Sequence, residues 1–244
     1  MEGYDSRSYG AAFADVYDDW YQGISDVDAT VATLLDLTPP GSAVLELAVG
    51  TGRLAVPLAA AGAAVGVRVA GIDASPEMLA RLAQRDPAGL VTAIDGDMVA
   101  DLPPGPFVAY NSLFNLTAAG AQAACFAAVA ERLGPGGRFV VEAFVPDEPF
   151  RDGDDVSVRT LTADRVVLSV SRHVAAAQSA EGQFVEFTNG AVRLRPWAIR
   201  YATPAQLDAY ATAVGLTLEH RWDDFTRAEF TSASVRHVSV YGKG

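Results

Sequence analysis

Three acidic residues stand close to the ends of short apolar segments in the first hundred residues, and the first of them leads into a glycine-rich turn. Residues 46–53 read Glu-Leu-Ala-Val-Gly-Thr-Gly-Arg, and Asp73 and Asp97 follow the next two apolar segments. Glycines between a strand and a helix permit positive φ and let the backbone approach a ligand closely. The Asp73 carboxylate can accept hydrogen bonds from both hydroxyls of a ribose. Asp97 can accept one from the exocyclic amine of an adenine, with Met98 against the ring.

This arrangement of residues is compatible with two kinds of nucleoside cofactor. Gly50, Gly52 and Ala55 fit the dinucleotide pattern Gly-x-Gly-x-x-Gly/Ala, with Asp73 for the ribose. Glu46 argues against a dinucleotide, because its carboxylate would face the pyrophosphate. A cationic ligand with a sulfonium and an amino group, as in S-adenosylmethionine, suits that carboxylate instead.

Strands and helices must position these residues, and the sequence predicts that the two alternate strictly after residue 42. This alternation indicates an α/β protein with a Rossmann-like, doubly wound parallel sheet. Ser75 and Pro76 are expected to begin one of the helices. The expected strands span residues 43–48, 67–73, 90–94, 106–111 and 138–144, and the expected helices span 53–61, 78–85 and 118–133. Aromatic residues at helical spacing predict further helices in the first forty residues, the second of them at about 25–37.

The sequence changes character after Pro146. Residues 156–174 and 183–201 alternate apolar with polar side chains and predict antiparallel strands, joined by turns such as Asn189-Gly190. We expect three parts: residues 1–146 with the N-terminal helices and the cofactor-binding core, 147–202 as an antiparallel lid, and 203–244 as a final helix and strands that complete the core.

Composition excludes several classes of function. The 244 residues include 18 Lys and Arg against 30 Asp and Glu, a net charge of −12. That charge has the wrong sign for nucleic acid and for an anionic membrane surface. A single cysteine, a polar N-terminus without a secretory signal and the lack of an uninterrupted apolar span predict a cytoplasmic protein. No cluster of residues has metal-ligand spacing, so we expect no metal.

Four segments together resemble class I S-adenosylmethionine-dependent methyltransferases. They are ValLeuGluLeuAlaValGlyThrGlyArg at 44–53, GlyIleAspAlaSerProGluMetLeu at 71–79, GlyAspMet at 96–98 and ArgLeuGlyProGlyGlyArgPheValValGlu at 132–142. The resemblance extends from about residue 10 to the end. Residues 14–21 are similar to the N-terminal helix of small-molecule members, including amino-sugar and natural-product enzymes. One departure is Ala48, where the family motif often has glycine.

The resemblance implies a role for each matched residue. Those expected to bind S-adenosylmethionine, and its product S-adenosylhomocysteine, are Tyr17, Glu46, Ala48, Gly50, Gly52, Arg53, Asp73, Ala74, Met78, Asp97, Met98, Asn111 and Leu113. Those expected to contact a small-molecule acceptor are Tyr21, Phe114, Asn115 and Arg200.

The expected reaction is direct displacement, in which a nitrogen or oxygen of the acceptor attacks the activated methyl group in line. The protein would contribute positioning and the exclusion of water. A neutral amine needs little beyond alignment, whereas a hydroxyl needs a general base, for which Tyr21 and His173 are the candidates.

Several alternatives stay open at this stage. Six arginines in the predicted lid, at positions 159, 165, 172, 193, 195 and 200, could recognise an anionic substrate or could neutralise local acidic residues. The fold could bind S-adenosylmethionine without transferring methyl, as a cyclase or a binding protein, or it could be an NAD-dependent oxidoreductase. A homodimer is also left open.

Overall fold

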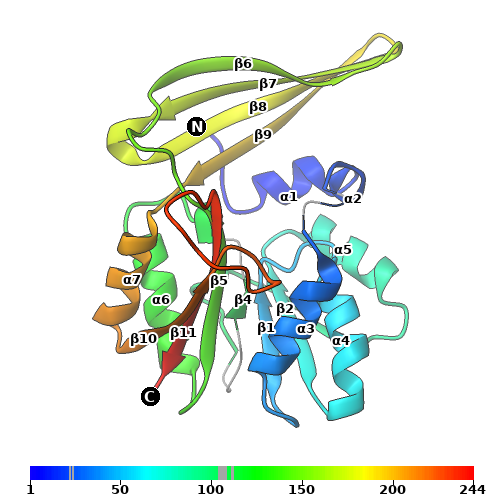
Figure 1. Cartoon of the computed structure of the whole chain (residues 1–244). Coiled ribbons are helices and arrows are strands. Elements are labelled where there is room, and N and C mark those ends of the chain that lie inside the picture. Colours follow the sequence, from blue (N-terminus) through cyan, green and yellow to red (C-terminus); the bar gives the residue numbers. More distant parts are fainter. Residues whose placement is uncertain (22, 24, 104–108, 111–112) are drawn as a thin grey trace.

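The fold is built on a seven-stranded sheet whose first five strands are parallel (Figure 1). The computed structural model describes residues 1–21, 23, 25–103, 109–110 and 113–244. The strands lie in the order β10-β11-β5-β4-β1-β2-β3, and β10 and β11 are antiparallel to their neighbours. Their bounds are β1 Ala43–Leu47, β2 Arg68–Asp73, β3 Val91–Asp95, β4 Ala109–Tyr110, β5 Arg138–Phe144, β10 Leu216–Trp222 and β11 Arg236–Lys243.

Helices cover both faces of this sheet, as the alternating sequence predicts. On one face, α3 Val27–Leu37, α4 Ala55–Gly62 and α5 Pro76–Arg85 enclose a core that includes Val44, Leu58 and Val140. On the other face, α6 Ala121–Arg132 and α7 Pro204–Ala213 enclose a core that includes Phe126 and Phe139. Short 3₁₀ turns lie at η1 Ala63–Val65, η2 Leu113–Asn115 and η3 Ala175–Ala177.

Local sequence signals explain where two of these helices begin. The Ser75 side chain accepts a hydrogen bond from the backbone N–H of Met78 at 3.3 Å, and Pro76 is the first residue of α5, as predicted. Thr203 and Gln206 form a reciprocal capping box at the start of α7.

A second, four-stranded antiparallel sheet follows β5, where antiparallel strands were predicted. Its strands are β6 Gly153–Leu161, β7 Arg165–Val174, β8 Ser179–Thr188 and β9 Ala191–Arg200, paired in that order. Asn189 and Gly190 both have positive φ, which is the conformation of a two-residue turn between β8 and β9. The sheet caps one end of the molecule, and α1 Ser8–Phe13 and α2 Tyr17–Trp20 lie between it and the main sheet (Figure 1).

Three expectations about element bounds need correction. The helix expected at 53–61 begins at Ala55, because residues 50–54 form the turn after β1. The helix expected at 118–133 begins at Ala121, after Gly120 in a left-handed conformation. The N-terminal region holds two short helices before α3 instead of one. Of the strand expected at 106–111, Ala109 and Tyr110 are a strand, and residues 104–108 and 111 lie outside the described residues.

No helix in the part of the chain described above combines the length and the apolar character that a membrane span requires.

Candidate active site

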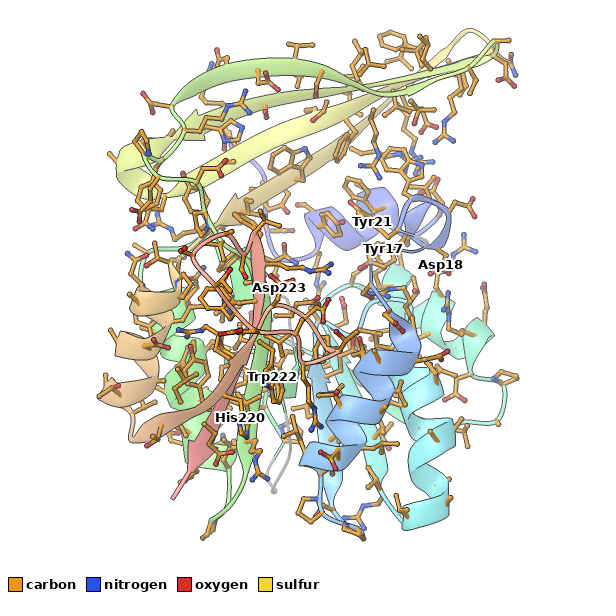
Figure 2. All side chains as sticks on the ribbon, viewed as in Figure 1. Tyr17, Asp18, Tyr21, His220, Trp222 and Asp223 are labelled. Carbon is orange, nitrogen blue, oxygen red and sulfur yellow. The ribbon has the colours of Figure 1, made fainter. Side chains whose placement is uncertain are left out.

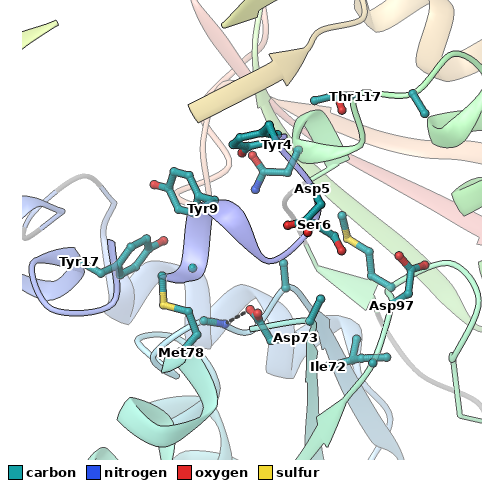
Figure 3. Close-up of a pocket in the computed structure, with 18 residues that line it drawn as sticks. Tyr4, Asp5, Ser6, Tyr9, Tyr17, Ile72, Asp73, Met78, Asp97 and Thr117 are labelled. Atoms are coloured by element: carbon teal, nitrogen blue, oxygen red, sulfur yellow. Dashed lines mark hydrogen bonds between the residues drawn. The ribbon is translucent and has the colours of Figure 1, made fainter. Parts of the chain in front are cut away.

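A cavity of about 220 Å³ lies where the carboxyl ends of β1, β2 and β3 meet the N-terminal segment (Figure 3). β1 lies between β2 and β4, so the chain leaves β1 at the point where the strand order reverses. Ligands of open α/β sheets bind at this kind of switch point. The cavity is lined by Tyr4, Asp5, Ser6, Tyr9, Gly10, Tyr17, Ala48, Gly50, Ile72, Asp73, Ala74, Met78, Gly96, Asp97, Met98, Asn115, Thr117 and Ala118.

The carboxylate of Asp73 is fixed at the end of β2 by two backbone N–H groups. One oxygen accepts a hydrogen bond from Gly50 N at 2.8 Å, and the other accepts one from Ser75 N at 2.8 Å. Burial raises the pKa of Asp73, although both N–H donors oppose that shift by stabilising the ionised form. Asp73 therefore joins the glycine turn after β1 to the start of α5, and its remaining lone pairs are available to a ligand.

Glu46 lies in β1 and is buried, with 7% of its surface exposed. Burial raises its pKa to about 8, while the positive charge of Arg53 acts in the opposite direction. Glu46 is absent from the described cavity lining, but its negative charge contributes to the raised pKa of Tyr17, which does line the cavity. A cation bound near the turn would favour the ionised form of Glu46 and lower its pKa.

Asp97 and Met98, which the sequence analysis assigns to adenine, follow β3 and line the cavity. Asp97 Oδ1 accepts hydrogen bonds from Val99 N at 2.8 Å and Ala100 N at 2.9 Å. The backbone N–H of Asp97 donates to Asp101 Oδ2 at 2.8 Å. These bonds orient the Asp97 carboxylate without occupying all its acceptor positions.

Tyrosines of the N-terminal segment close the cavity on the side opposite the strands. Tyr4, Tyr9 and Tyr17 line it, and the Tyr9 hydroxyl donates a hydrogen bond to the Tyr21 hydroxyl at 2.9 Å. Tyr17 and Tyr21 lie together between the two sheets (Figure 2), with ring centroids 4.8 Å apart. Burial raises the pKa of Tyr17 to about 12 and that of Tyr9 well above its ordinary value. Tyr9 and Tyr17 therefore remain protonated at neutral pH and can donate or accept hydrogen bonds.

Asp18 links this tyrosine-bearing segment to the glycine turn after β1. Its carboxylate accepts a hydrogen bond from Thr51 Oγ1 at 2.7 Å, and Thr51 is the residue between Gly50 and Gly52. The same carboxylate forms an ion pair with Arg85 at the end of α5, at 2.5 Å. The side chain of Asp18 points from α2 toward these elements in Figure 2.

Several residues expected at the site lie beside the cavity without lining it. Gly52 packs against Leu82, and Arg53 donates to Ser25 Oγ at 2.7 Å. Leu113 and Phe114 are buried in the core on the α6 face. Asn115, the next residue, does line the cavity. Asn111 lies outside the described residues.

Two of the expected polar side chains have other partners. Arg200 Nε donates to the carbonyl oxygen of Thr117 at 2.9 Å and so supports a segment that lines the cavity. His173 lies on β7, is absent from the described cavity lining, and its Nε2 is 3.2 Å from Ser171 Oγ. Burial and the charge of Arg151 lower the pKa of His173.

The arginines of the second sheet have partners within the chain. Arg195, which is 2% exposed, binds Asp15 and Glu186, and Arg165 also binds Glu186. Arg193 pairs with Asp15 and Arg172 with Asp154. Arg159 donates to the carbonyl oxygen of Trp20 at 3.1 Å, with its guanidinium 4.7 Å from the centre of that ring. This pattern favours the neutralisation of local acidic groups over recognition of an anionic substrate.

The sequence reasoning missed Tyr4, Asp5, Ser6 and Tyr9, which reach the cavity from the N-terminus. One signal could have found Tyr9, because it precedes Phe13, Tyr17 and Tyr21 at intervals of four residues. Tyr4 to Ser6 carry no such signal, since their place depends on contacts with distant parts of the chain.

Comparison with known proteins decides the family. A family model described as a methyltransferase domain matches residues 44–137. The structure of the CcbJ methyltransferase from Streptomyces caelestis is 35% identical, with a TM-score of 0.87, and the match covers 99% of this chain and 100% of CcbJ. The chain belongs to the S-adenosylmethionine-dependent methyltransferases.

Other solved structures agree with this assignment. DesVI from Streptomyces venezuelae is 28% identical, with a TM-score of 0.69, and the match covers 95% of this methyltransferase and 98% of DesVI. CalS10 from Micromonospora echinaspora, an amino pentose methyltransferase solved with S-adenosylmethionine bound, has the same fold at 22% identity, a TM-score of 0.65 and complete coverage of both chains. A search of the curated proteins gave no match.

The cavity of this methyltransferase fits S-adenosylmethionine. Its carboxylates at Asp73 and Asp97 are held in place by backbone N–H groups, and Glu46 is buried nearby. Gly50 has a positive φ of 57°, and the space beside its Cα is open, because the nearest atom to a β-carbon placed there is the carbonyl oxygen of Ala48 at 4.0 Å. Because the chain belongs to the S-adenosylmethionine-dependent methyltransferases, the oxidoreductase alternative is set aside, and the enzyme uses S-adenosylmethionine.

Proposed function

We propose that this enzyme methylates an amine nitrogen of a small molecule, with an amino sugar or related natural-product intermediate as the substrate class. The observation that carries this proposal is the chemistry of the cavity wall. Its described lining includes tyrosine, serine, threonine, asparagine and aspartate side chains, and no histidine, lysine or cysteine. A neutral amine can attack a methyl group without a base, whereas a hydroxyl needs one.

The polar groups in the lining are poor bases for a hydroxyl acceptor. Tyr9 and Tyr17 are protonated at neutral pH. Hydrogen bonds from Ser8 and from the Arg7 backbone lower the pKa of Asp5. Asp73 and Asp97 are hydrogen-bonded to backbone N–H groups at the cofactor end. Each of these groups suits the binding and orientation of an amine better than the removal of a hydroxyl proton.

We assign the cofactor contacts residue by residue. S-adenosylmethionine supplies an activated methyl group on its sulfonium. Asp73 accepts hydrogen bonds from the ribose, Asp97 accepts one from the adenine amine, and Met98 contacts the ring. Glu46 compensates the positive charge at the methionine end of S-adenosylmethionine. The backbone of Ala48 and Gly50 lies along that end of the cofactor.

We assign acceptor binding to the tyrosine side of the cavity. Tyr9 and Tyr17 face the cavity, and Tyr21 orients the Tyr9 hydroxyl. Asn115 offers an amide on the opposite wall. The second sheet, which holds α1 and α2 in place, covers this side and reduces access of water. The relatives described as a sugar N-methyltransferase, KedS8, and as an amino pentose methyltransferase, CalS10, support the same class of acceptor.

A matched set of acceptors tests the proposal. The enzyme is incubated with S-adenosylmethionine carrying a deuterated methyl group and with pairs of sugars that differ only in an amine or a hydroxyl at one carbon. We expect label on the amine-bearing members, with a rate that rises with pH as the amine loses its proton. Label on hydroxyl oxygens alone would contradict N-methylation.

Calorimetric titration separates failure of the acceptor assignment from failure of cofactor binding. S-adenosylhomocysteine should bind and NAD should not. Binding of S-adenosylhomocysteine with no labelled product from any acceptor would favour the non-methylating alternative, a cyclase or a binding protein.

A further inference from the structure

The short helix α2 directs its side chains to three different parts of the molecule. Trp20 packs on the second sheet, where its ring centroid lies 5.5 Å from that of Phe184. Tyr17 lines the cavity, and Asp18 reaches the glycine turn after β1 (Figure 2). A displacement of α2 would therefore change the cavity wall and the contact with the glycine turn together.

The attachment of this segment to the second sheet is buried. Arg195, which is 2% exposed, donates to Asp15 Oδ1 at 2.7 Å and to Glu186 Oε2 at 2.8 Å. Arg195 also donates to the carbonyl oxygen of Ala12. Breaking such a contact is costly, because it leaves a buried charge without its partner. The N-terminal helices are therefore held firmly against the second sheet.

The attachment to the glycine turn depends on more exposed groups. The side chains of Asp18 and Arg85 are 42% and 32% exposed, so water screens their ion pair and it contributes little. Thr51 is 1% exposed, and its hydroxyl donates to the Asp18 carboxylate at 2.7 Å. The negative charge of the acceptor strengthens this hydrogen bond, which ties α2 directly to the turn.

The direction of the Thr51 hydroxyl depends on the conformation of the turn. Gly50 and Gly52, on either side of Thr51, have φ values of 57° and 75°, and glycine can leave this region at little steric cost. Gly50 N donates to Asp73, and both residues line the cavity. A ligand that contacts these two residues would therefore restrict the turn and, with it, the Thr51 hydroxyl.

We propose that Asp18 is a positioning residue that couples ligand binding at the glycine turn to the placement of Tyr17. When a nucleoside ligand occupies the cavity, the turn is fixed, Thr51 holds Asp18, and α2 keeps Tyr17 against the cavity. Because such coupling is reciprocal, the closure of α2 strengthens ligand binding by the same factor. The role of this coupling in catalysis rests on the proposed function: with Tyr17 on the acceptor side, that side is complete only once the cofactor is bound.

Amide hydrogen exchange of the whole enzyme, with and without saturating S-adenosylhomocysteine, tests the proposal. The N–H groups of Trp20 and Tyr21 donate to Val16 O and Tyr17 O at 2.8 and 3.0 Å, so their exchange reports the opening of α2. We expect S-adenosylhomocysteine to slow this exchange about tenfold in the wild type, within the usual range of coupling. Thr51→Val, which removes the hydroxyl but keeps the shape, should reduce the slowing to less than about twofold, and Thr51→Ser should retain it.

Control variants separate this hydrogen bond from its surroundings. Thr33→Val in α3 removes another buried hydroxyl, which donates to Phe225 O at 2.8 Å and is not in the described cavity lining. Thr33→Val should retain the slowing, and so should Arg85→Met, which removes only the exposed ion pair. Asp18→Ala changes a side chain that is 42% exposed, so it should fold, and it should lose the slowing as Thr51→Val does.

The free and bound measurements together distinguish coupling from support of the fold. A hydrogen bond that merely supports the fold would affect exchange equally in the free and the bound enzyme, so an undiminished slowing in Thr51→Val and Asp18→Ala would overturn the proposal. A wild type that binds S-adenosylhomocysteine in calorimetry without slowing at Trp20 and Tyr21 would overturn it as well. A wild type that does not bind S-adenosylhomocysteine would overturn the cofactor assignment itself, and the coupling with it.

Discussion

Gly10 on α1 and Ser75 at the start of α5 touch so closely that no side chain fits between them. A β-carbon on Gly10 would lie 2.2 Å from Ser75 Cβ and 3.1 Å from Met78 Cγ. Gly10 and Met78 line the cavity, so this contact sets how closely α1 covers the cofactor end.

Replacing Gly10 with alanine should separate α1 from α5, because the backbone cannot absorb an overlap of this size in place. Overpacking of this kind costs about 1–3 kcal/mol. We expect the KM for S-adenosylmethionine to rise about tenfold and amide hydrogen exchange in residues 8–13 to increase. Ala11→Ser, which adds one heavy atom at an exposed position of the same helix, is the control and should change neither quantity.

Asp73 is expected to contribute strongly to cofactor affinity. Because its carboxylate binds Gly50 N and Ser75 N and faces the cavity, Asp73→Ala should weaken binding of S-adenosylhomocysteine at least about tenfold in calorimetry. The control is Asp95→Asn, which removes a neighbouring carboxylate at the end of β3 that is not in the described lining. An affinity that Asp73→Ala leaves unchanged would show that the ribose lies elsewhere.

The gathering of Asp73, Asp97 and the glycine turn at one end of the cavity could be predicted from sequence because its signals are local. Residues 46–53, Asp73 and Asp97 each follow a short apolar strand, and parallel strands bring their carboxyl ends to one edge of the sheet. The cap at Ser75 and the Asn189-Gly190 turn depend only on their neighbours in the chain, and both were predicted.

The acceptor side was harder to predict because it depends on contacts between distant segments. Arg195 is paired with Asp15, which is 180 residues away, and this pairing decides whether the arginine is free for a substrate. Tyr4 and Asp5 reach the cavity only because the N-terminus runs beneath the second sheet. For His173, sequence alternation indicates a strand but leaves its register against β6 and β8 unknown, and the register determines its neighbours.

Glu46 makes the stability of the cofactor-free enzyme depend on pH. Its pKa is about 8 in the folded state and near 4.5 when unfolded, so the folded state holds an extra proton between these values. Below pH 4.5 Glu46 is protonated in both states and does not lower the free energy of unfolding. As pH rises from there to about 8, the free energy of unfolding falls by about 1.4 kcal/mol per pH unit. Glu46→Gln should therefore become increasingly more stable than wild type between pH 5 and 8, measured by urea unfolding.

The same substitution should weaken cofactor binding, because it removes the charge that compensates the cation. We expect Glu46→Gln to bind S-adenosylmethionine more weakly. Wild type should release a proton from Glu46 when it binds the cofactor at about pH 7, so its calorimetric binding heat should depend on the buffer. The variant should lose this proton release and the buffer dependence. A stability difference that does not change with pH would mean that Glu46 is already ionised in the folded enzyme.

Ala48 holds a backbone conformation that disfavours any side chain. Its φ is +53°, in the left-handed region, where a β-carbon costs about 1–2 kcal/mol. Ala48→Gly removes this strain but adds conformational freedom to the unfolded chain, about 0.4–1 kcal/mol in the opposite direction. We expect a net gain of up to about 1 kcal/mol, seen as a Tm about 2–4 °C higher. The control is Ala60→Gly at an exposed position inside α4, where φ is helical and glycine should lower Tm by a similar amount. If both substitutions lowered Tm equally, the turn after β1 would not be strained at Ala48, and the departure from glycine in the family motif would carry no energetic cost.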